Sequence, residues 1–231
     1  MIETLQESVQ RLASLDREVL AIAWLSLRVS VLAVLIGTVI GVPLGALVAV
    51  LRFRGRDWLV GLLNACMGLP PVIVGLLVYL LLSRSGPLGP LGLLFTPSAM
   101  VAAQSVLVTP LIAALTRQIV ADADAHLGEQ LRSLRLPPWR RAGVLIFDVR
   151  FSLVTALLAA FGRAVSEIGA VLVVGGNIDG YTRTMTTAIS LETQKGDLAL
   201  ALSLGLVLIG LVLAVNALAT LLRAYAVRAY G

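Results

Sequence analysis

The run VSVLAVLIGTVIGVPLGALVAVL, residues Val29–Leu51, carries no charged side chain. A helix needs about 20 consecutive apolar residues to cross the hydrocarbon core of a bilayer. Two further uncharged runs, Trp58–Ser83 and Leu198–Leu222, are also long enough. These runs predict a protein built of membrane-spanning helices.

The composition agrees with that prediction. Of the 231 residues, 58% are hydrophobic and 13% are charged. Soluble domains have about 45–50% apolar and about 25% charged residues, so an ordinary soluble domain is excluded. The net charge of +5 could suggest nucleic acid, but in such an apolar chain we interpret it as loop charge that orients helices in the bilayer. We therefore expect membrane lipid around the chain, and no nucleic acid.

Two more spans are predicted between these runs. The segment Ser85–Thr116 begins with the loop-like GPLGPLG and becomes compatible with a helix near Pro97. The segment Phe151–Ile178 is long enough but carries two charges, Arg163 and Glu167. We predict an all-α integral membrane protein of one domain, residues 1–231, with five spans at about 27–51, 58–83, 97–117, 149–175 and 198–222. Leu5, Val9 and Leu12 form one stripe, which predicts an N-terminal helix on the membrane surface.

The arginines give the orientation of the spans. They gather after the first span (52–56), between the third and fourth (117–150) and after the fifth (223–228). With five spans, all three groups lie on one side of the membrane, and the positive-inside rule makes that side cytoplasmic. The N-terminus is then outside and the C-terminus inside.

The segment EQLRSLRLPPWRR, Glu129–Arg141, interrupts the apolar chain within a predicted cytoplasmic region at about 118–148. Leu127, Leu131 and Leu134 lie at i, i+4 and i+7, which predicts one apolar stripe on a short helix over Asp122–Leu136. Pro137 would end this helix, and Pro138 suits the first position of the next. The stripe either rests on lipid headgroups or enters a groove on a cytoplasmic partner. The candidate contact residues are Leu127, Glu129, Leu131, Arg132, Leu134 and Arg135.

The sequence lacks the motifs of a self-sufficient enzyme. No GxxxxGK[ST] motif occurs, and the only lysine, Lys195, lies in QKGD, so the chain is not an ATPase of that type. A single cysteine, Cys66, and a single histidine, His126, give no metal-binding cluster. We expect no catalytic residue, metal or cofactor in this chain.

Arg163 and Glu167 are costly in a spanning segment, where each charge disfavours insertion by about 2.5–3.5 kcal/mol. At i and i+4 of one helix they can pair, so we expect them to face the protein interior or a wet cavity, with Ser166 beside them. A structural pair and a role in gating or anion passage both remain open.

The segment FGRAVSEIGAVLVVGGNIDGYTRTMTTAISLETQKGDLALAL, Phe161–Leu202, resembles the matching block of tungstate-type permeases, the membrane subunits of type I ABC importers. Ser26–Arg56 and Gly68–Leu82 are similar to the first two spans of molybdate, tungstate and sulfate permeases. The loop motif of that family is Glu-Ala-Ala with a glycine four residues after the last alanine. Glu129 matches its glutamate, while Gln130 and Leu131 replace the alanines and Arg135 replaces the glycine.

The resemblance implies an importer of a tetrahedral oxyanion, tungstate first, then molybdate or sulfate, in a bacterial or archaeal cytoplasmic membrane. It implies two copies of this chain, two copies of an ATPase subunit that binds ATP and Mg, and an extracytoplasmic oxyanion-binding protein. The predicted cytoplasmic helix would couple ATPase motion to the spans. The rival interpretation is a self-contained proton-coupled carrier or an intramembrane enzyme that uses Arg163 and Glu167.

The segment Gly175–Lys195 is predicted to be extracytoplasmic or re-entrant, and its GGN and DGY sequences predict an irregular backbone. At membrane depth such a backbone would have to line a cavity or be buried in protein. Hydroxyl donors and an arginine there could pass an oxyanion by weak contacts, or the threonines could be filler in a turn. The candidate pathway or gate residues are Arg163, Ser166, Glu167, Asn177, Thr182, Arg183 and Thr184.

Overall fold

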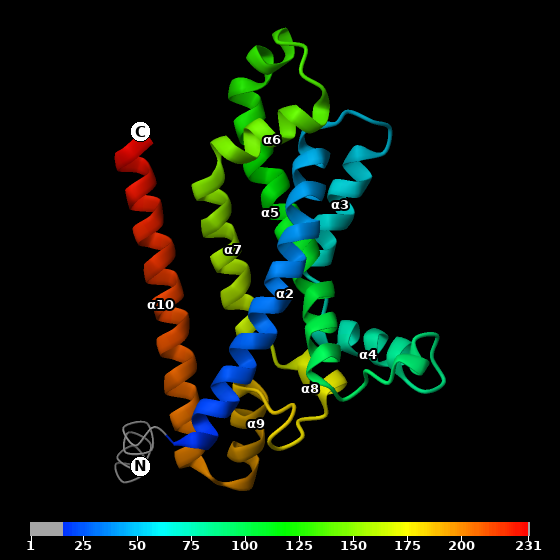
Figure 1. Cartoon of the computed structure of the whole chain (residues 1–231), viewed down its shortest axis with the longest axis vertical. Coiled ribbons are helices and arrows are strands. Elements are labelled where there is room, and N and C mark those ends of the chain that lie inside the picture. Colours follow the sequence, from blue (N-terminus) through cyan, green and yellow to red (C-terminus); the bar gives the residue numbers. More distant parts are fainter. Residues whose placement is uncertain (1–15, 231) are drawn as a thin grey trace. The chain divides into compact units, whose positions relative to one another are not determined.

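The computed structural model describes residues 16–230, and every regular element in that range is a helix. From the N-terminus these are α2 (Arg17–Val50), α3 (Arg56–Met67), α4 (Pro71–Leu82), the short 3₁₀ helix η1 (Gly89–Leu91), α5 (Pro97–Ser133), α6 (Pro138–Asp148), α7 (Arg150–Val165), α8 (Gly169–Gly175), α9 (Met185–Lys195) and α10 (Leu198–Tyr230), labelled in Figure 1 where there is room. The predicted all-α fold is confirmed. The predicted surface helix at Leu5, Val9 and Leu12 lies outside the described residues.

Three helices are long and apolar enough to cross a membrane alone: Arg17–Val50, Pro97–Ser133 and the Leu198–Leu222 part of α10. Two pairs reach that length only as bent spans, α3 with α4 at 99° and α6 with α7 at 78°. The described residues thus contain three to five candidate spans, and the five predicted spans agree with the upper figure.

The helices belong to two compact units. The first unit contains residues 16–33, Pro70–Gln104 and Gly162–Ala214, and the second contains Val34–Leu69, Ser105–Phe161 and 215–230. Each unit has its own buried side chains: Met100, Val171 and Leu204 in the first, Ile112, Val120 and Leu145 in the second.

The second predicted span is broken at Pro70-Pro71, as the prolines predicted. Pro70 is extended at φ −63° and ψ 121°, and Pro71 is the first residue of α4. A proline disfavours helical backbone at the residue before it and provides no N–H, so α3 cannot continue into α4. Two helices of 12 residues therefore replace one straight span.

The helix of the third predicted span begins at Pro97 as expected, and it extends beyond the predicted span end near residue 117. Helix α5 continues to Ser133, so Asp122–Leu136 is not a separate helix. Alanine, leucine, glutamine and arginine predominate there, and these residues favour a helix once one has started. The predicted start of the next helix at Pro138 is confirmed, because α6 begins there.

The fourth predicted span, at about 149–175, is not continuous either. Helix α7 ends at Val165 and α8 begins at Gly169, which leaves a non-helical break at residues 166–168. This break separates the two charged residues that the sequence placed on one helix face.

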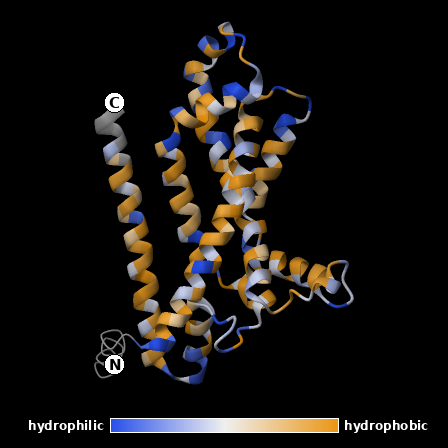
Figure 2. Ribbon diagram, in the orientation of Figure 1, coloured by the Kyte–Doolittle hydropathy of each residue, from blue (hydrophilic) through white to orange (hydrophobic). Residues whose placement is uncertain are grey.

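Hydrophobic residues predominate in α2, α4 and α10, as the hydropathy colouring of the ribbon in Figure 2 shows. Several are highly exposed in the single chain, including Val39 at 73% and Leu213 at 64%. Such a surface suits lipid rather than water. The chain is therefore an integral membrane protein.

Candidate functional site

The segment that was predicted to be cytoplasmic forms a helical corner, defined here as residues 122–148: the end of α5, a turn and α6. Arg141 of α6 donates from Nε to Oδ1 of Asp124 on α5 at 2.9 Å, and its Nη2 bonds to both carboxylate oxygens. The two side chains are only 11% and 16% exposed. A bidentate arginine–carboxylate pair of this kind fixes α6 against α5 in one orientation.

The leucine stripe faces the interior of the corner rather than a partner. Leu131 is 9% exposed and belongs to a cluster with Ala142 and Leu145 of α6, against which Leu127 also packs. The interpretation of Leu131 as an exposed contact is therefore wrong: its stripe is the packing face between α5 and α6. Only Leu134 of the three is exposed, at 67%.

The surface of the corner carries a different apolar set. Leu134, Trp139 and Phe147 are 67%, 68% and 69% exposed. Glu129, Arg132 and Arg135 are exposed as well. Large apolar side chains bordered by arginines are the usual composition of a protein-binding surface.

Arg135 lies in the turn of the corner with φ at +52°, a left-handed conformation that favours glycine. It is the residue that stands where the loop motif described above has its glycine.

We predict that Arg135→Gly stabilises the chain, because glycine has no Cβ to strain the left-handed conformation. The expected gain is about 1 kcal/mol, which corresponds to a rise of about 2–4 °C in the unfolding temperature of the detergent-purified protein. Arg140→Gly, in the regular helix α6, is the matched control and should lower that temperature. An equal or lower unfolding temperature for Arg135→Gly would contradict the prediction.

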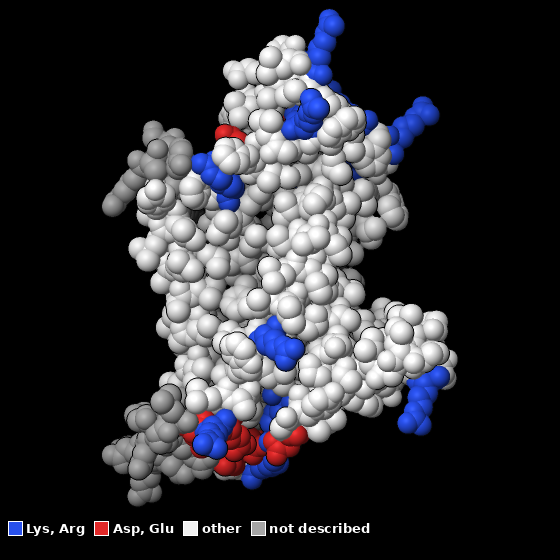
Figure 3. All heavy atoms as spheres, in the orientation of Figure 1, with Lys and Arg blue, Asp and Glu red and all other residues white. Residues whose placement is uncertain are grey.

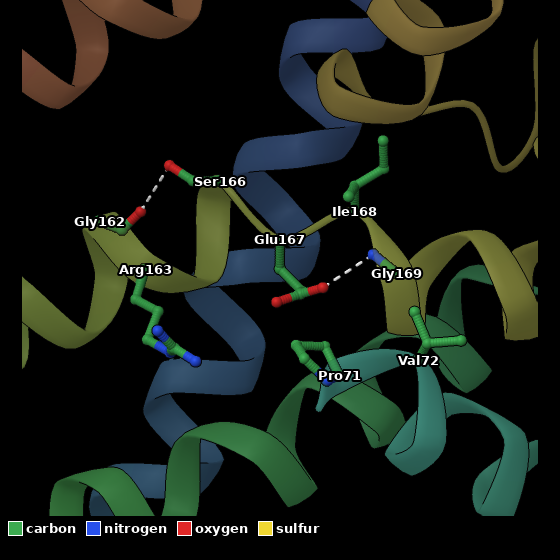
Figure 4. A pocket seen from close by; sticks show the side chains of 8 residues that line it. All are labelled: Pro71, Val72, Gly162, Arg163, Ser166, Glu167, Ile168 and Gly169. Carbon is green, nitrogen blue, oxygen red and sulfur yellow. Dashed lines mark hydrogen bonds between the residues drawn. The ribbon is translucent and has the colours of Figure 1, made fainter. Parts of the chain in front are cut away.

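The break between α7 and α8 opens on a pocket of about 610 Å³, seen in Figure 4 and lined by Pro71, Val72, Gly162, Arg163, Ser166, Glu167, Ile168 and Gly169. Glu167 accepts a hydrogen bond at Oε1 from the backbone N–H of Gly169 at 2.8 Å. The Ser166 hydroxyl donates to the carbonyl of Gly162 at 2.9 Å and so closes the end of α7.

The expected pairing of Arg163 with Glu167 is not formed. The helix ends between them, so the i, i+4 spacing does not bring their side chains together, and the carboxylate turns toward α8 (Figure 4). Within residues 16–230 no carboxylate pairs with Arg163, whose side chain is exposed at the pocket. An unpaired guanidinium facing lipid at the bilayer centre would cost about 2.5–3.5 kcal/mol, so this face requires water, an anion or another protein surface.

Thr182 and Thr184 are buried, and their hydroxyls are used inside the fold. Thr182 donates to the Gly175 carbonyl at 2.6 Å and accepts from the Ile178 N–H at 2.9 Å. Thr184 is the N-cap of α9 and forms a capping box with Thr187. These two residues therefore build the turn before α9. The backbone between α8 and α9, which contains most of GGN and all of DGY, is irregular as predicted, and α9 begins at Met185.

Asn177 and Arg183 are also held within the first unit. Asn177 has a φ of +50° and donates from Nδ2 to the Thr187 carbonyl at 3.4 Å. Arg183 Nη1 lies 3.1 Å from Asp179 and 3.7 Å from the buried carboxylate of Glu192, which also binds Lys195. Acidic and basic side chains gather on this unit in Figure 3. The Arg183 charge is thus neutralised by carboxylates, unlike that of Arg163.

Three positions matter to this geometry but were missed from the sequence. Ser26 of α2 accepts a hydrogen bond from the Met185 N–H at 2.7 Å. Gln104 of α5 donates from Nε2 to the Ala164 carbonyl at 2.9 Å, near the end of α7. Arg56 donates to the Val48 and Ala49 carbonyls and caps α2. A polar residue inside an apolar run, as at Ser26 and Gln104, was the available signal.

Comparison with known proteins gives a consistent result. Residues 41–229 match the family model described as "Binding-protein-dependent transport system inner membrane component". A probable anion ABC transporter permease protein of Haloferax volcanii is 41% identical over 86% of this chain and 88% of its own length. Tungstate uptake system permease proteins of Peptoclostridium acidaminophilum and Campylobacter jejuni are 37% and 38% identical, over 93% and 71% of this chain and 94% and 69% of their own lengths.

The family match covers most of the chain and includes both the helical corner and the pocket. Members of this family are transport components rather than enzymes, and they work with an ATPase and a substrate-binding protein. The chain belongs to the family of inner-membrane components of binding-protein-dependent transport systems, and it is the multi-pass permease subunit of an ABC importer.

Proposed function

We propose that this permease imports a tetrahedral oxyanion, with tungstate as its first substrate, molybdate the second and sulfate the third. The observation that carries the choice is the similarity to two permeases named for tungstate uptake, one of them over 93% of this chain. These anions share shape and charge, and the binding protein that delivers them selects among them.

The working complex contains two copies of this chain and two ATPase subunits, which hold ATP and Mg. In the chain itself we propose no bound cofactor. A single permease chain of three to five spans offers few helices to surround a pathway, and a two-fold pair would supply twice as many. The arginine groups at 52–56 and 117–150 support a cytoplasmic position for the corner, with the N-terminus outside and the C-terminus inside.

The corner is suited to transmit motion. Helix α5 runs without a break from Pro97 to Ser133, and the Arg141–Asp124 pair fixes α6 to its end. When an ATPase subunit bound to the exposed side chains of Leu134, Trp139 and Phe147 moves, the motion is therefore transmitted to the continuous helix α5. ATP binding would change the spans from an inward-facing to an outward-facing arrangement, which accepts the anion from the binding protein. ATP hydrolysis would return them to the inward-facing arrangement.

Family membership sets aside the rival interpretation of a carrier or enzyme that acts alone. Its proposed acid–base pair is also not assembled, because Arg163 lies on α7 while Glu167 lies in the non-helical break and bonds to the Gly169 N–H.

The test is transport in proteoliposomes that contain this chain, its ATPase and its binding protein, with radiolabelled tungstate, molybdate or sulfate outside. We expect ATP-dependent accumulation of tungstate with the highest ratio of rate to half-saturating concentration. Accumulation without the ATPase, or a preference for an unrelated solute, would overturn the proposal.

The exposed apolar surface of the helical corner, to which we propose that the ATPase binds, gives a separate prediction. Leu134→Glu places a charge on an exposed side chain and should leave the fold intact, while it weakens ATPase association and uptake at least about tenfold, since hot-spot contacts contribute 2 kcal/mol or more. Leu131→Glu is the matched comparison, because burial of an unpaired carboxylate should reduce the yield of folded protein itself. Co-purification with the ATPase and monodispersity in detergent separate the two effects. Normal co-purification of Leu134→Glu would place the contact elsewhere.

A further inference from the structure

We propose, on the basis of the function proposed above, that Arg163 is a contact for the oxyanion within the spanning part of the chain, and that Glu167 competes with the oxyanion for it. The site is the pocket at the break between α7 and α8. Its ligand class is a doubly charged tetrahedral oxyanion.

The position of Arg163 suits such a contact. Arg150 opens α7 at the arginine-rich end, and Arg163 lies 13 residues further on, which is about 20 Å along a helix. The hydrocarbon core is about 30 Å thick, so an upright α7 would bring this charge to membrane depth. A guanidinium offers a planar fork of donors that fits two oxygens of a tetrahedral oxyanion.

The Arg163 guanidinium can bind an anion because the carboxylate of Glu167, its expected partner, bonds to the Gly169 N–H instead. Glu167 uses Oε1 to accept the Gly169 N–H at 2.8 Å, and its backbone carbonyl accepts the Thr186 hydroxyl at 2.9 Å. Both contacts hold residues 166–168 out of helical conformation. The ends of the break are thus bonded to α8 and α9, and no carboxylate among residues 16–230 pairs with the Arg163 guanidinium.

The sequence also encodes a second arrangement. If α7 continued through Glu167, the i, i+4 spacing would bring the carboxylate onto the same face as Arg163, where the two charges would pair. Pairing with Glu167 would neutralise the charge of the Arg163 guanidinium, and the carboxylate would repel a dianion bound there. The break therefore corresponds to an anion-accepting state, and the continuous helix to an anion-releasing state.

The hydrogen bonds that differ between these states are few. Extension of α7 requires release of the Gly169 N–H and of the Thr186 hydroxyl from Glu167. Gln104 already bonds to the Ala164 carbonyl at the end of α7, while its Oε1 is buried without a partner. A buried acceptor without a donor is a local source of instability next to the element that would move.

The test uses the reconstituted complex with its ATPase and binding protein, and inorganic tungstate as the probe. Glu167→Gln keeps an amide oxygen that can accept the Gly169 N–H but removes the competing charge. We expect the detergent-purified complex with this variant to bind tungstate about tenfold more tightly in equilibrium dialysis without the binding protein, within the usual range of coupling between sites. Its uptake rate should fall, because release is slowed.

Arg163→Gln should lower tungstate uptake at least about tenfold, since hydrogen bonds to a charged group are lost. Binding-protein-stimulated ATP hydrolysis should persist, which shows that the complex is assembled. The double variant Arg163→Gln/Glu167→Gln should lose the tighter binding of Glu167→Gln. Arg84→Gln, an exposed arginine of a connecting loop, is the charge-matched control and should behave as the unmodified protein.

The outcomes separate this inference from the proposed function. If the unmodified complex transports no tungstate, molybdate or sulfate, the proposed function fails and the inference with it. If the unmodified complex transports tungstate and Arg163→Gln does so equally well, only the inference is overturned. Unchanged tungstate affinity in Glu167→Gln would overturn the competition between the carboxylate and the anion.

Discussion

Gly45→Leu is expected to abolish accumulation of the folded permease. Gly37, Gly41 and Gly45 recur every fourth residue on α2 and face α5, and Gly45 is the tightest position. A Cβ added there would lie 2.3 Å from the Ala113 carbonyl oxygen and 2.9 Å from Cβ of Thr116. Backbone atoms cannot rotate away, so even one carbon must push the two helices apart.

Overpacking of this kind usually costs about 1–3 kcal/mol, and a whole leucine side chain at a backbone contact should exceed that range. Close approach of helices at small residues is also a main source of association in a membrane, because lipid provides no hydrophobic drive between helices. The measurement is the yield of monodisperse protein in detergent, together with its unfolding temperature.

Gly61→Ala provides the matched control, since a Cβ at Gly61 of α3 meets no atom within 4 Å. Replacement of glycine by alanine in a helix should be neutral or stabilising by up to about 1 kcal/mol. Folded Gly45→Leu protein with an unchanged unfolding temperature would show that α2 and α5 do not pack as described.

The second large effect is expected from Asp124→Ala in the helical corner. This change leaves the Arg141 guanidinium, 11% exposed, without its carboxylate. Removal of one partner of a buried ion pair costs about 3–5 kcal/mol. We expect α6 to detach from α5, tungstate uptake to be lost, and trypsin to cut rapidly among the arginines at 132–141.

Asp122→Ala, an exposed carboxylate two residues away, is the control and should keep uptake and trypsin resistance. The double variant Asp124→Leu/Arg141→Met replaces both charges by apolar groups and should recover resistance, because no charge is then left buried alone. Slow cleavage of Asp124→Ala, equal to that of Asp122→Ala, would contradict a structural role for the pair.

Much of the fold could be predicted because membrane spans depend on local composition. The uncharged runs, the bend at Pro70-Pro71 and the helix starts at Pro97 and Pro138 follow from length, hydropathy and the missing N–H of proline. Leu127 and Leu131 of the predicted stripe do share a packing face of α5, whereas Leu134 lies beyond the helix and is exposed. What the stripe contacts was not predictable, since a stripe on one helix does not reveal whether its partner is α6 or another protein.

The site residues were harder to predict for the same reason. The spacing of Arg163 and Glu167 predicted a pair, which would be right for a continuous helix. The helix ends between them because Glu167 bonds to α8 and α9, contacts made by residues that follow it in the chain. Thr182 and Thr184 were identified as polar, but their burial and internal partners depend on how the loop folds back.

By itself, the sequence determined that this chain crosses a membrane and where its breaking residues lie, because the transfer free energy of a side chain and the geometry of proline act locally. Only the tertiary structure decided that Leu131 is buried, that Asp124 binds Arg141, and that no carboxylate in the described part of the chain pairs with Arg163. In each case more than one group could form the contact, and which group does so depends on how the helices pack against one another.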